Sequence, residues 1–178
     1  MPEDIESIKQ KALTSYNRKD YQAALEGFNY CLSYYTAASD ELAASEMLNN
    51  ISVTYLGLKD PQKAYEAAAG TDEVFTRHAD RKRQGIALAN TATALEQLNR
   101  KEEALALYEQ VLEIFKEIGE KDMRITILRR VSDLQLKTKR QLQAIASMES
   151  AYDQKEKRSA RESIFHTLLT SIRQKFIK

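Results

Sequence analysis

The chain has 178 residues, with 27 Lys and Arg against 26 Asp and Glu, only two prolines and five glycines, one cysteine and no tryptophan. No stretch approaches about 18 consecutive apolar residues, and the acidic, polar amino terminus lacks the pattern of a secretory signal, so we expect neither a membrane span nor secretion. Good helix formers dominate, and a single cysteine cannot form an internal disulfide. These features predict an all-α protein of the reducing cytoplasm.

A register of alanines recurs along the chain with a constant period of forty. Its members are Ala24, Ala64, Ala104 and Ala144. A second register with the same period holds only small residues, Ala12, Ser52, Ala92 and Ser132. A third holds large aliphatic residues, Ile8, Leu48, Leu88 and Leu128. Three registers that agree over four copies indicate an array of stacked supersecondary units, which usually presents binding surfaces.

Each copy contains two stretches of helical periodicity with a short break between them. The copies cover about residues 5–38, 45–78, 85–118 and 125–153. In the second copy, Asp60 and Pro61 form a helix-start signal after the break. Gly70 costs about 1 kcal/mol inside a helix, so we expect the second helix of this copy to be bent, short or restarted at Asp72.

The tail, residues 156–177, has the pattern of the first helix of a fifth copy whose partner helix is missing. Leu168 lies one full period after Leu128 and continues the aliphatic register, whereas Ile172 breaks the small one. The predicted apolar stripe contains Ile164, Phe165, Leu168, Ile172 and Phe176. We expect a capping helix with a polar, basic outer face.

No catalytic or metal-binding constellation is visible. The histidines, His78 and His166, lack the spacing of metal ligands, and the glycines form no phosphate-binding loop. Glu102 and Glu103 lie at a helix start, where they suit the helix dipole. Cys31 falls on the apolar face of its helix, which predicts a buried core residue. We therefore expect no enzymatic activity, no metal and no cofactor.

The repeated residues resemble the tetratricopeptide repeat. Its pattern of large, small, Ala and aromatic residues is matched by Leu88, Ala92, Ala104 and Tyr108, and by Ile8, Ala12, Ala24 and Phe28. The resemblance covers about residues 5–152, in a lengthened variant whose period is forty and which lacks the family's Trp and closing Pro. It implies one domain over 1–178, an α-solenoid of four helix pairs plus a C-terminal cap, wound as a right-handed superhelix whose first helices line a concave groove.

The resemblance also implies which residues face this groove. One row holds Gln10, Asn50, Asn90 and Arg130, and in related proteins such an asparagine ladder holds an extended peptide by its backbone. Two neighbouring rows hold Lys9, Asn49, Ala89 and Arg129, and Leu13, Val53, Thr93 and Asp133. The predicted peptide-binding residues are Lys137 and all members of these three rows except Ala89. Leu13 and Val53 indicate an apolar end, whereas Arg129, Arg130 and Lys137 indicate a basic one.

The sequence thus predicts a non-enzymatic adaptor or scaffold that binds a protein partner through a peptide with apolar and acidic groups. The alternative is a homo-oligomer, such as a homodimer, that associates through its groove or its ends. Residues 1–120 carry 13 basic and 20 acidic residues, a net charge of −7, and residues 121–178 carry 14 and 6, a net of +8, which would suit self-association. Nucleic-acid binding is disfavoured because the acidic excess of the first part opposes it and no aromatic residues interleave with the basic ones.

Overall fold

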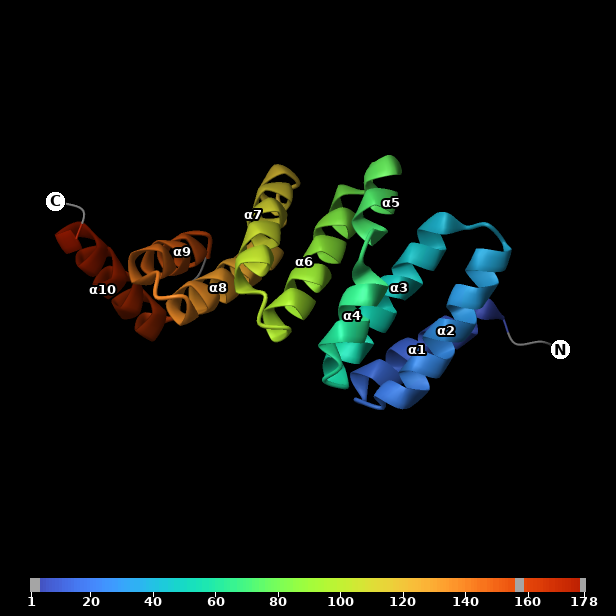
Figure 1. Ribbon diagram of the computed structural model, residues 1–178. Coiled ribbons are helices and arrows are strands. Elements are labelled where there is room, and N and C mark those ends of the chain that lie inside the picture. The colour runs from blue at the N-terminus through green and yellow to red at the C-terminus, as the bar shows by residue number, and fades with distance from the viewer. Residues whose placement is uncertain (1–3, 156–158, 177–178) are drawn as a thin grey trace. The chain divides into compact units, whose positions relative to one another are not determined.

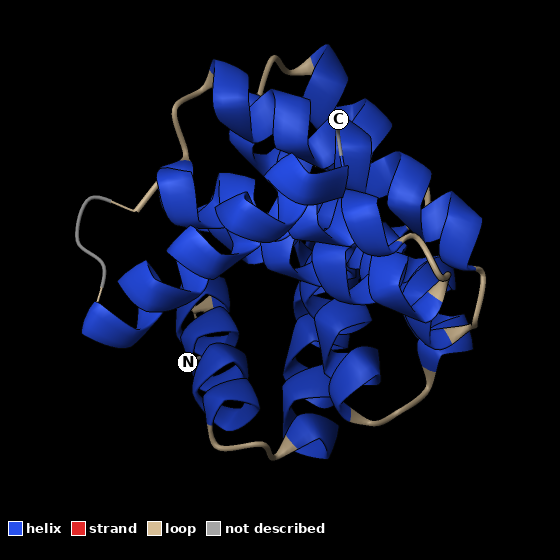
Figure 2. Cartoon of the chain, turned by 90° about the vertical axis from the view of Figure 1, so that its left-hand side faces the viewer, coloured by secondary structure: helices blue, strands red, loops and turns tan. Residues whose placement is uncertain are grey.

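The computed structural model of the protein describes residues 4–155 and 159–176, and these residues form helices joined by short turns, with no strand among them (Figures 1 and 2). The chain divides into two compact units, Met1–Arg100 and Lys101–Lys178. The first unit contains α1 (Ile5–Asn17), α2 (Tyr21–Ala37), α3 (Glu41–Gly57), α4 (Pro61–Ala68), α5 (Thr71–Arg77) and α6 (Arg81–Gln97). The second contains α7 (Lys101–Glu117), α8 (Lys121–Lys137), α9 (Gln141–Asp153) and α10 (Ala160–Phe176).

A single turn geometry recurs at regular intervals along the chain. The residue with positive φ is Lys19, Ser39, Lys59, Ala79, Asn99, Gly119 or Lys139 in turn. In each case the next residue donates its N–H to a carbonyl five residues earlier, for example Asp40 to Tyr35 at 2.9 Å and Arg140 to Gln135 at 2.8 Å. This pattern satisfies the free carbonyls at a helix end. The first three copies of the repeat are therefore each built with two equivalent turns, and the fourth has one, at Lys139.

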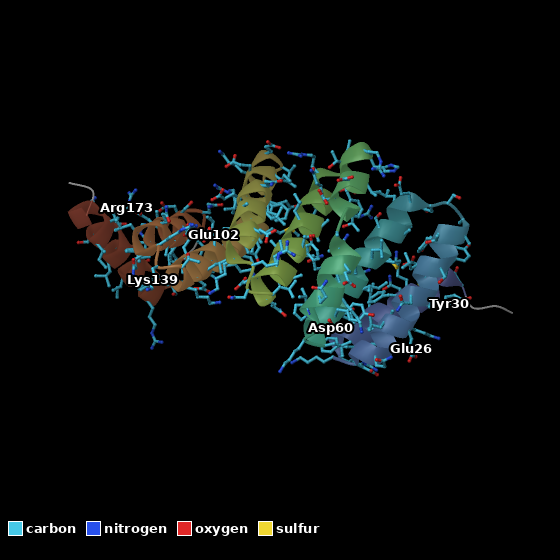
Figure 3. The ribbon with its side chains drawn as sticks, in the orientation of Figure 1. Glu26, Tyr30, Asp60, Glu102, Lys139 and Arg173 are labelled. Atoms are coloured by element: carbon cyan, nitrogen blue, oxygen red, sulfur yellow. The ribbon has the colours of Figure 1, made fainter. Side chains whose placement is uncertain are left out.

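Four of these turns also start the next helix in the same way. Asp20, Asp40, Asp60 and Asp80 each accept, through their carboxylates, a hydrogen bond from the N–H three residues later. A side-chain acceptor at this position satisfies one of the free N–H groups of a helix start. Asp60, labelled in Figure 3, precedes Pro61 at the first position of α4, which confirms the predicted start signal.

The alanine and small-residue registers are buried, and in the first, second and fourth copies they lie where the paired helices cross. Ala24, Ala64 and Ala104 are fully buried and Ala144 nearly so. The hydroxyl of Ser52 donates to the Ala64 carbonyl at 2.8 Å, and Ser132 donates to the Ala144 carbonyl at the same distance. A methyl group added at Gly27 would lie 2.7 Å from the Ala12 Cβ. Small residues are needed because the two backbones approach closely.

One core cluster of the first unit lies between α1, α2 and α3. Phe28 and Met47 are almost fully buried there, packed with Ile51 and with Cys31, whose burial was predicted from the sequence. Tyr30 and Glu26 lie one turn apart on the exposed side of α2 (Figure 3). The core therefore requires one stripe of each helix and leaves the other side free.

The second helix of the second copy is broken, as the sequence predicts at Gly70. Helix α4 ends at Ala68, Gly70 has a φ of +80°, and α5 starts at Thr71. Both pieces contact α3 and α6. A left-handed residue cannot continue a helix, and glycine adopts this conformation without a steric cost.

The tail packs differently from its predicted stripe. Helix α10 contacts α9 through Leu169, which is 7% exposed, whereas Leu168 is 54% exposed and Ile164 is also exposed. The prediction that Leu168 continues the buried aliphatic register is therefore wrong. Polar contacts explain why Leu169 is buried in place of Leu168. Thr170 and Arg173 both bind the buried Glu149, and these contacts fix the rotation of α10 about its axis. Residues 156–158 and 177 and the side chain of Phe176, which belong to the predicted cap, lie outside the described part.

Candidate functional site

The predicted peptide-binding residues lie on the first helices of the copies. In the first unit they are Lys9, Gln10 and Leu13 on α1, Asn49, Asn50 and Val53 on α3, and Asn90 and Thr93 on α6. In the second unit they are Arg129, Arg130, Asp133 and Lys137 on α8. Their solvent exposure is not uniform. Gln10, Arg130, Asp133 and Lys137 are exposed, Asn49 is buried, and the others are half-buried.

The structure places Asn49 inside the protein and not on a free surface. Its side chain is 7% exposed, and its amide nitrogen donates to the Ser45 carbonyl and to the Thr71 hydroxyl, both at 3.0 Å. The Thr71 hydroxyl in turn donates to the Ala68 carbonyl at 2.7 Å. This carbonyl is at the end of α4, where the break removes its helical partner. Asn49 therefore supports the broken helix, because buried polar groups need partners.

Asn90 extends this network from α3 to α6, the first helix of the third copy. Its amide nitrogen donates to Oδ1 of Asn49 at 3.0 Å, so the side chain of Asn90 is held in one orientation. An asparagine amide has two N–H groups and an acceptor oxygen, so this bond leaves Asn90 with further capacity to donate and accept. Asn50 differs again, since no side-chain hydrogen bond of Asn50 is found among the described residues.

Thr71 was not predicted from the sequence as part of this arrangement. Gly70 indicated the helix break, but no periodicity pairs Thr71 with an asparagine 22 residues earlier. A polar side chain directly after the glycine was the available signal, since threonine hydroxyls commonly cap free backbone groups.

A chain of ion pairs also links the first helices of the first unit. Lys9 on α1 lies 3.6 Å from Glu46 on α3, and Arg83 on α6 lies 3.1 Å from the other oxygen of Glu46. Burial alone would lower the pKa of Lys9, but its hydrogen bond to Glu6 and the charge of Glu46 together raise it. Glu6 and Glu46 occupy equivalent positions of the first two copies, a register that could have revealed this chain. The charge of Lys9 is thus balanced within the protein.

In the second unit the predicted basic residues make contacts of their own. Arg130 donates to the Tyr108 hydroxyl at 3.4 Å, and Arg129 lies 3.7 Å from the carboxylate of Glu162. A hollow of about 510 Å³ lies beside Arg129. Its lining is mostly polar and consists of Lys121, Asp122, Ile125, Thr126, Arg129, Gln154 and Lys155.

Glu162 caps the start of α10 and also forms an ion pair with a lysine. It accepts from the Lys155 ammonium at 2.6 Å and from the N–H of Ser159 at 3.0 Å, while the Ser159 hydroxyl accepts from the N–H of Glu162. This reciprocal arrangement is a capping box. The hydrogen bond from Lys155, followed by that from Ser159, lowers the pKa of Glu162 to about 2.

Two further observations concern metal binding and membrane insertion. Within residues 4–155 and 159–176, no three His, Cys, Asp or Glu side chains gather as a metal site would require. None of the described helices combines the length and the apolar character that crossing a membrane demands.

Solved structures share this helical-repeat architecture. Aspartyl phosphate phosphatase F from Bacillus subtilis matches 86% of this chain with a TM-score of 0.74 and 11% identity, and the chain spans only 42% of the length of that protein. BtubC (BKLC) from P. vanneervenii matches 96% of this chain and 78% of its own, with a TM-score of 0.68 and 13% identity. A Podosopora anserina putative kinesin light chain with nearly identical TPR-like repeats matches 97% of this chain and 96% of its own, with a TM-score of 0.56 and 15% identity. No protein-family model and no curated protein matches the sequence.

These likenesses define the class of fold. The chain is an all-α helical-repeat protein. More narrowly, it has the tetratricopeptide-like α-solenoid fold that its three registers predict. At identities of 11% to 15% the likeness extends to the fold alone.

Proposed function

We propose that this chain is a non-enzymatic interaction module that binds an extended peptide of a partner protein on the first-helix surface of its first unit. We define the first-helix surface by Gln10, Leu13, Asn50, Val53, Asn90 and Thr93. The single observation that carries the proposal is the contrast among its asparagines. Asn49 is used internally and orients Asn90, whereas the amide of Asn50 makes no side-chain hydrogen bond among the described residues.

The spacing of successive copies supports a peptide ligand that is bound through its backbone. Packed helices lie about 8–10 Å apart, and an extended peptide advances about 3.3 Å per residue, so equivalent side chains of successive copies match about every third residue of a peptide. An amide side chain can donate to a peptide carbonyl and accept from a peptide N–H. Such contacts hold a peptide without reading its side chains.

Apolar side chains on the first-helix surface would supply specificity. Leu13 and Val53 are half-buried, and each retains apolar surface that a ligand side chain can cover. The second unit, taken by itself, presents Arg129, Arg130 and Lys137, which are partly or fully exposed and favour acidic groups. We include in this proposal a location in the reducing cytoplasm, since the single cysteine of the chain is buried and cannot form an internal disulfide.

The test compares two double variants. Wild-type protein is immobilised, partners from the source cell are identified by mass spectrometry, and the bound segment is mapped and made as a synthetic peptide. Asn50→Ala with Asn90→Ala should weaken peptide binding by about 1–3 kcal/mol per lost pairing, because buried peptide groups lose partners. The control, Gln22→Ala with Gln62→Ala, changes two exposed amides at equivalent positions of successive copies on α2 and α4, outside the first-helix surface.

Circular dichroism must show that both double variants are folded. Equal peptide affinity of the folded asparagine variant and wild type would overturn the proposal. Light scattering of the free protein at low salt tests the alternative of self-association, since charge-driven contacts weaken as salt rises.

A further inference from the structure

A second hollow, in the second unit, has a different chemistry from the first-helix surface. It measures about 210 Å³ and opens between α8, α9 and α10. It is lined by Ser132, Leu136, Ala144, Ile145, Met148, Phe165 and Leu169. The hydroxyl of Ser132 already donates to the Ala144 carbonyl, so the walls present apolar groups. The volume suits one or two large apolar side chains.

The repeat explains why this hollow is open. Phe28 and Tyr108 occupy equivalent positions of the first and third copies, and both are almost fully buried. In the first unit, Phe28 packs in one cluster with Ala12 and Ala24. The fourth copy has Met148 at this position, while Ser132 and Ala144 stand where Ala12 and Ala24 stand in the first. An aromatic ring is therefore absent at the position where the hollow lies.

The rim of the hollow exposes apolar surface to solvent. Leu136 and Phe165 line the hollow and are both exposed, and Leu142, Ile164 and Leu168 on α9 and α10 are exposed as well. A single exposed leucine is ordinary on a protein surface, but Leu136 and Phe165, both exposed at the edge of one apolar hollow, are typical of a docking surface.

The charges beside this surface are mainly basic. Lys137 ends α8 and Lys139, labelled in Figure 3, lies in the turn that follows, whereas Arg140 of this turn pairs with Glu102 at 2.6 Å. Arg161 is exposed one turn before Phe165. The neighbouring carboxylates are mostly used within the unit. The buried Glu149 pairs with the partly exposed Arg173, and Glu162 binds Lys155.

The basic charge beside the hollow distinguishes among the ligands that could occupy it. Asp133 is an exposed carboxylate on α8 one turn before Leu136, so the basic character belongs to the α8–α9 turn and α10. A second copy docked symmetrically would bring the same basic groups against themselves. A lipid surface would not require a hollow of side-chain size. An acidic ligand with a protruding apolar group satisfies both the charge and the shape.

We propose that this hollow and its rim bind an acidic amphipathic helix of a partner protein, and that one large apolar side chain of this helix fills the space that Met148 leaves open. The site is separate in sequence and chemistry from the first-helix surface and does not depend on the function proposed for it. Apolar anchors at helical spacing would lie on the rim, and acidic groups would face Lys139 and Arg161.

The probe is an end-blocked helical peptide of about four turns with Phe and Leu at i, i+3 and i+7 and Glu at most other positions. A matched peptide has Lys in place of every Glu. Fluorescence anisotropy should show saturable binding of the Glu peptide to the full chain, at least tenfold tighter than that of the Lys peptide and weaker at high salt. Met148→Phe, which fills the hollow from within, should reduce binding at least tenfold, whereas Met148→Ala keeps the hollow open and should retain binding.

Leu58→Glu is the surface control, since it adds a negative charge at an exposed leucine of the first unit and should leave binding unchanged. Circular dichroism verifies that Met148→Phe is folded. Equal binding of the two peptides, or undiminished binding by folded Met148→Phe, would refute the proposal. Sedimentation that shows a dimer broken by Met148→Phe would assign the hollow to a second copy instead. Binding to phosphatidylserine vesicles that is lost in the same variant would assign it to lipid and equally overturn the proposal.

Discussion

The side chain of Asn90 donates to Oδ1 of Asn49 at 3.0 Å, which joins α6 to α3. From Asn49 the hydrogen bonds continue to the Thr71 hydroxyl and end at the carbonyl of Ala68, which is the last residue of α4. The two asparagines therefore have different roles, although both lie on first helices. Asn49 completes the hydrogen bonding of a broken helix, and Asn90 is oriented by it.

Asn49→Ala should lower the free energy of unfolding by about 1–3 kcal/mol, because it leaves the buried Thr71 hydroxyl and the Asn90 amide without their partner. Asn50→Ala, one residue later, removes a half-buried side chain without such bonds and should change stability by less than about 0.5 kcal/mol. Urea denaturation followed by circular dichroism measures both. Similar losses for the two variants would contradict the network.

Lys139→Gly should stabilise the second unit. Lys139 has a φ of 63°, a conformation that costs a residue with a Cβ about 1–2 kcal/mol. Glycine loses about 0.5–1 kcal/mol through its greater freedom in the unfolded chain, so we expect a net gain of about 0.5–1 kcal/mol. The control is Ala106→Gly at an exposed site within α7, which should cost about 1 kcal/mol. Thermal melts should therefore move in opposite directions.

Ala24→Leu should destabilise the first unit by about 1–3 kcal/mol, because Ala24 is fully buried and extra methyl groups overfill a packed site. Gln22→Leu places the same side chain at an exposed position of the same helix and should have little effect. Chemical denaturation of the two variants provides the comparison. Equal stabilities would show that the alanine register does not mark the helix crossing.

The pH dependence of Glu162 has a definite sign. Its pKa falls from 4.5 to about 2 on folding, so its interaction with Lys155 contributes stability above pH 4.5 and loses this contribution as the pH falls toward 2. Glu162→Gln should therefore melt at a lower temperature than wild type at pH 7, and the difference should shrink below pH 4.5. Glu109→Gln, the control, removes an exposed carboxylate of α7 and should leave the melting temperature at pH 7 unchanged. A difference that stays constant from neutral pH down to the acid limit of the titration would exclude the assigned pKa.

The fold could be predicted because its determinants recur locally. Ala24, Ala64, Ala104 and Ala144 stand at one spacing, and close packing at a helix crossing admits only small residues, so the repeat and its helical class follow from the residues alone. Asp60 with Pro61 and the left-handed Gly70 are likewise local signals, since each acts on the backbone within a few residues.

The polar contacts could not be predicted in this way. Asn49 and Asn50 are adjacent and chemically identical, and only the packing of α5 and α6 against α3 decides that the first is buried and the second is not. Leu168 fits the aliphatic register, yet Thr170 and Arg173 bind the buried Glu149 and rotate α10 so that Leu169 is buried instead. Periodicity thus determined which helices exist and how they repeat. The rotation of α10 and the partners of each amide depended on side chains far apart in sequence, because hydrogen bonds and charge pairs form only where the tertiary structure brings their atoms together.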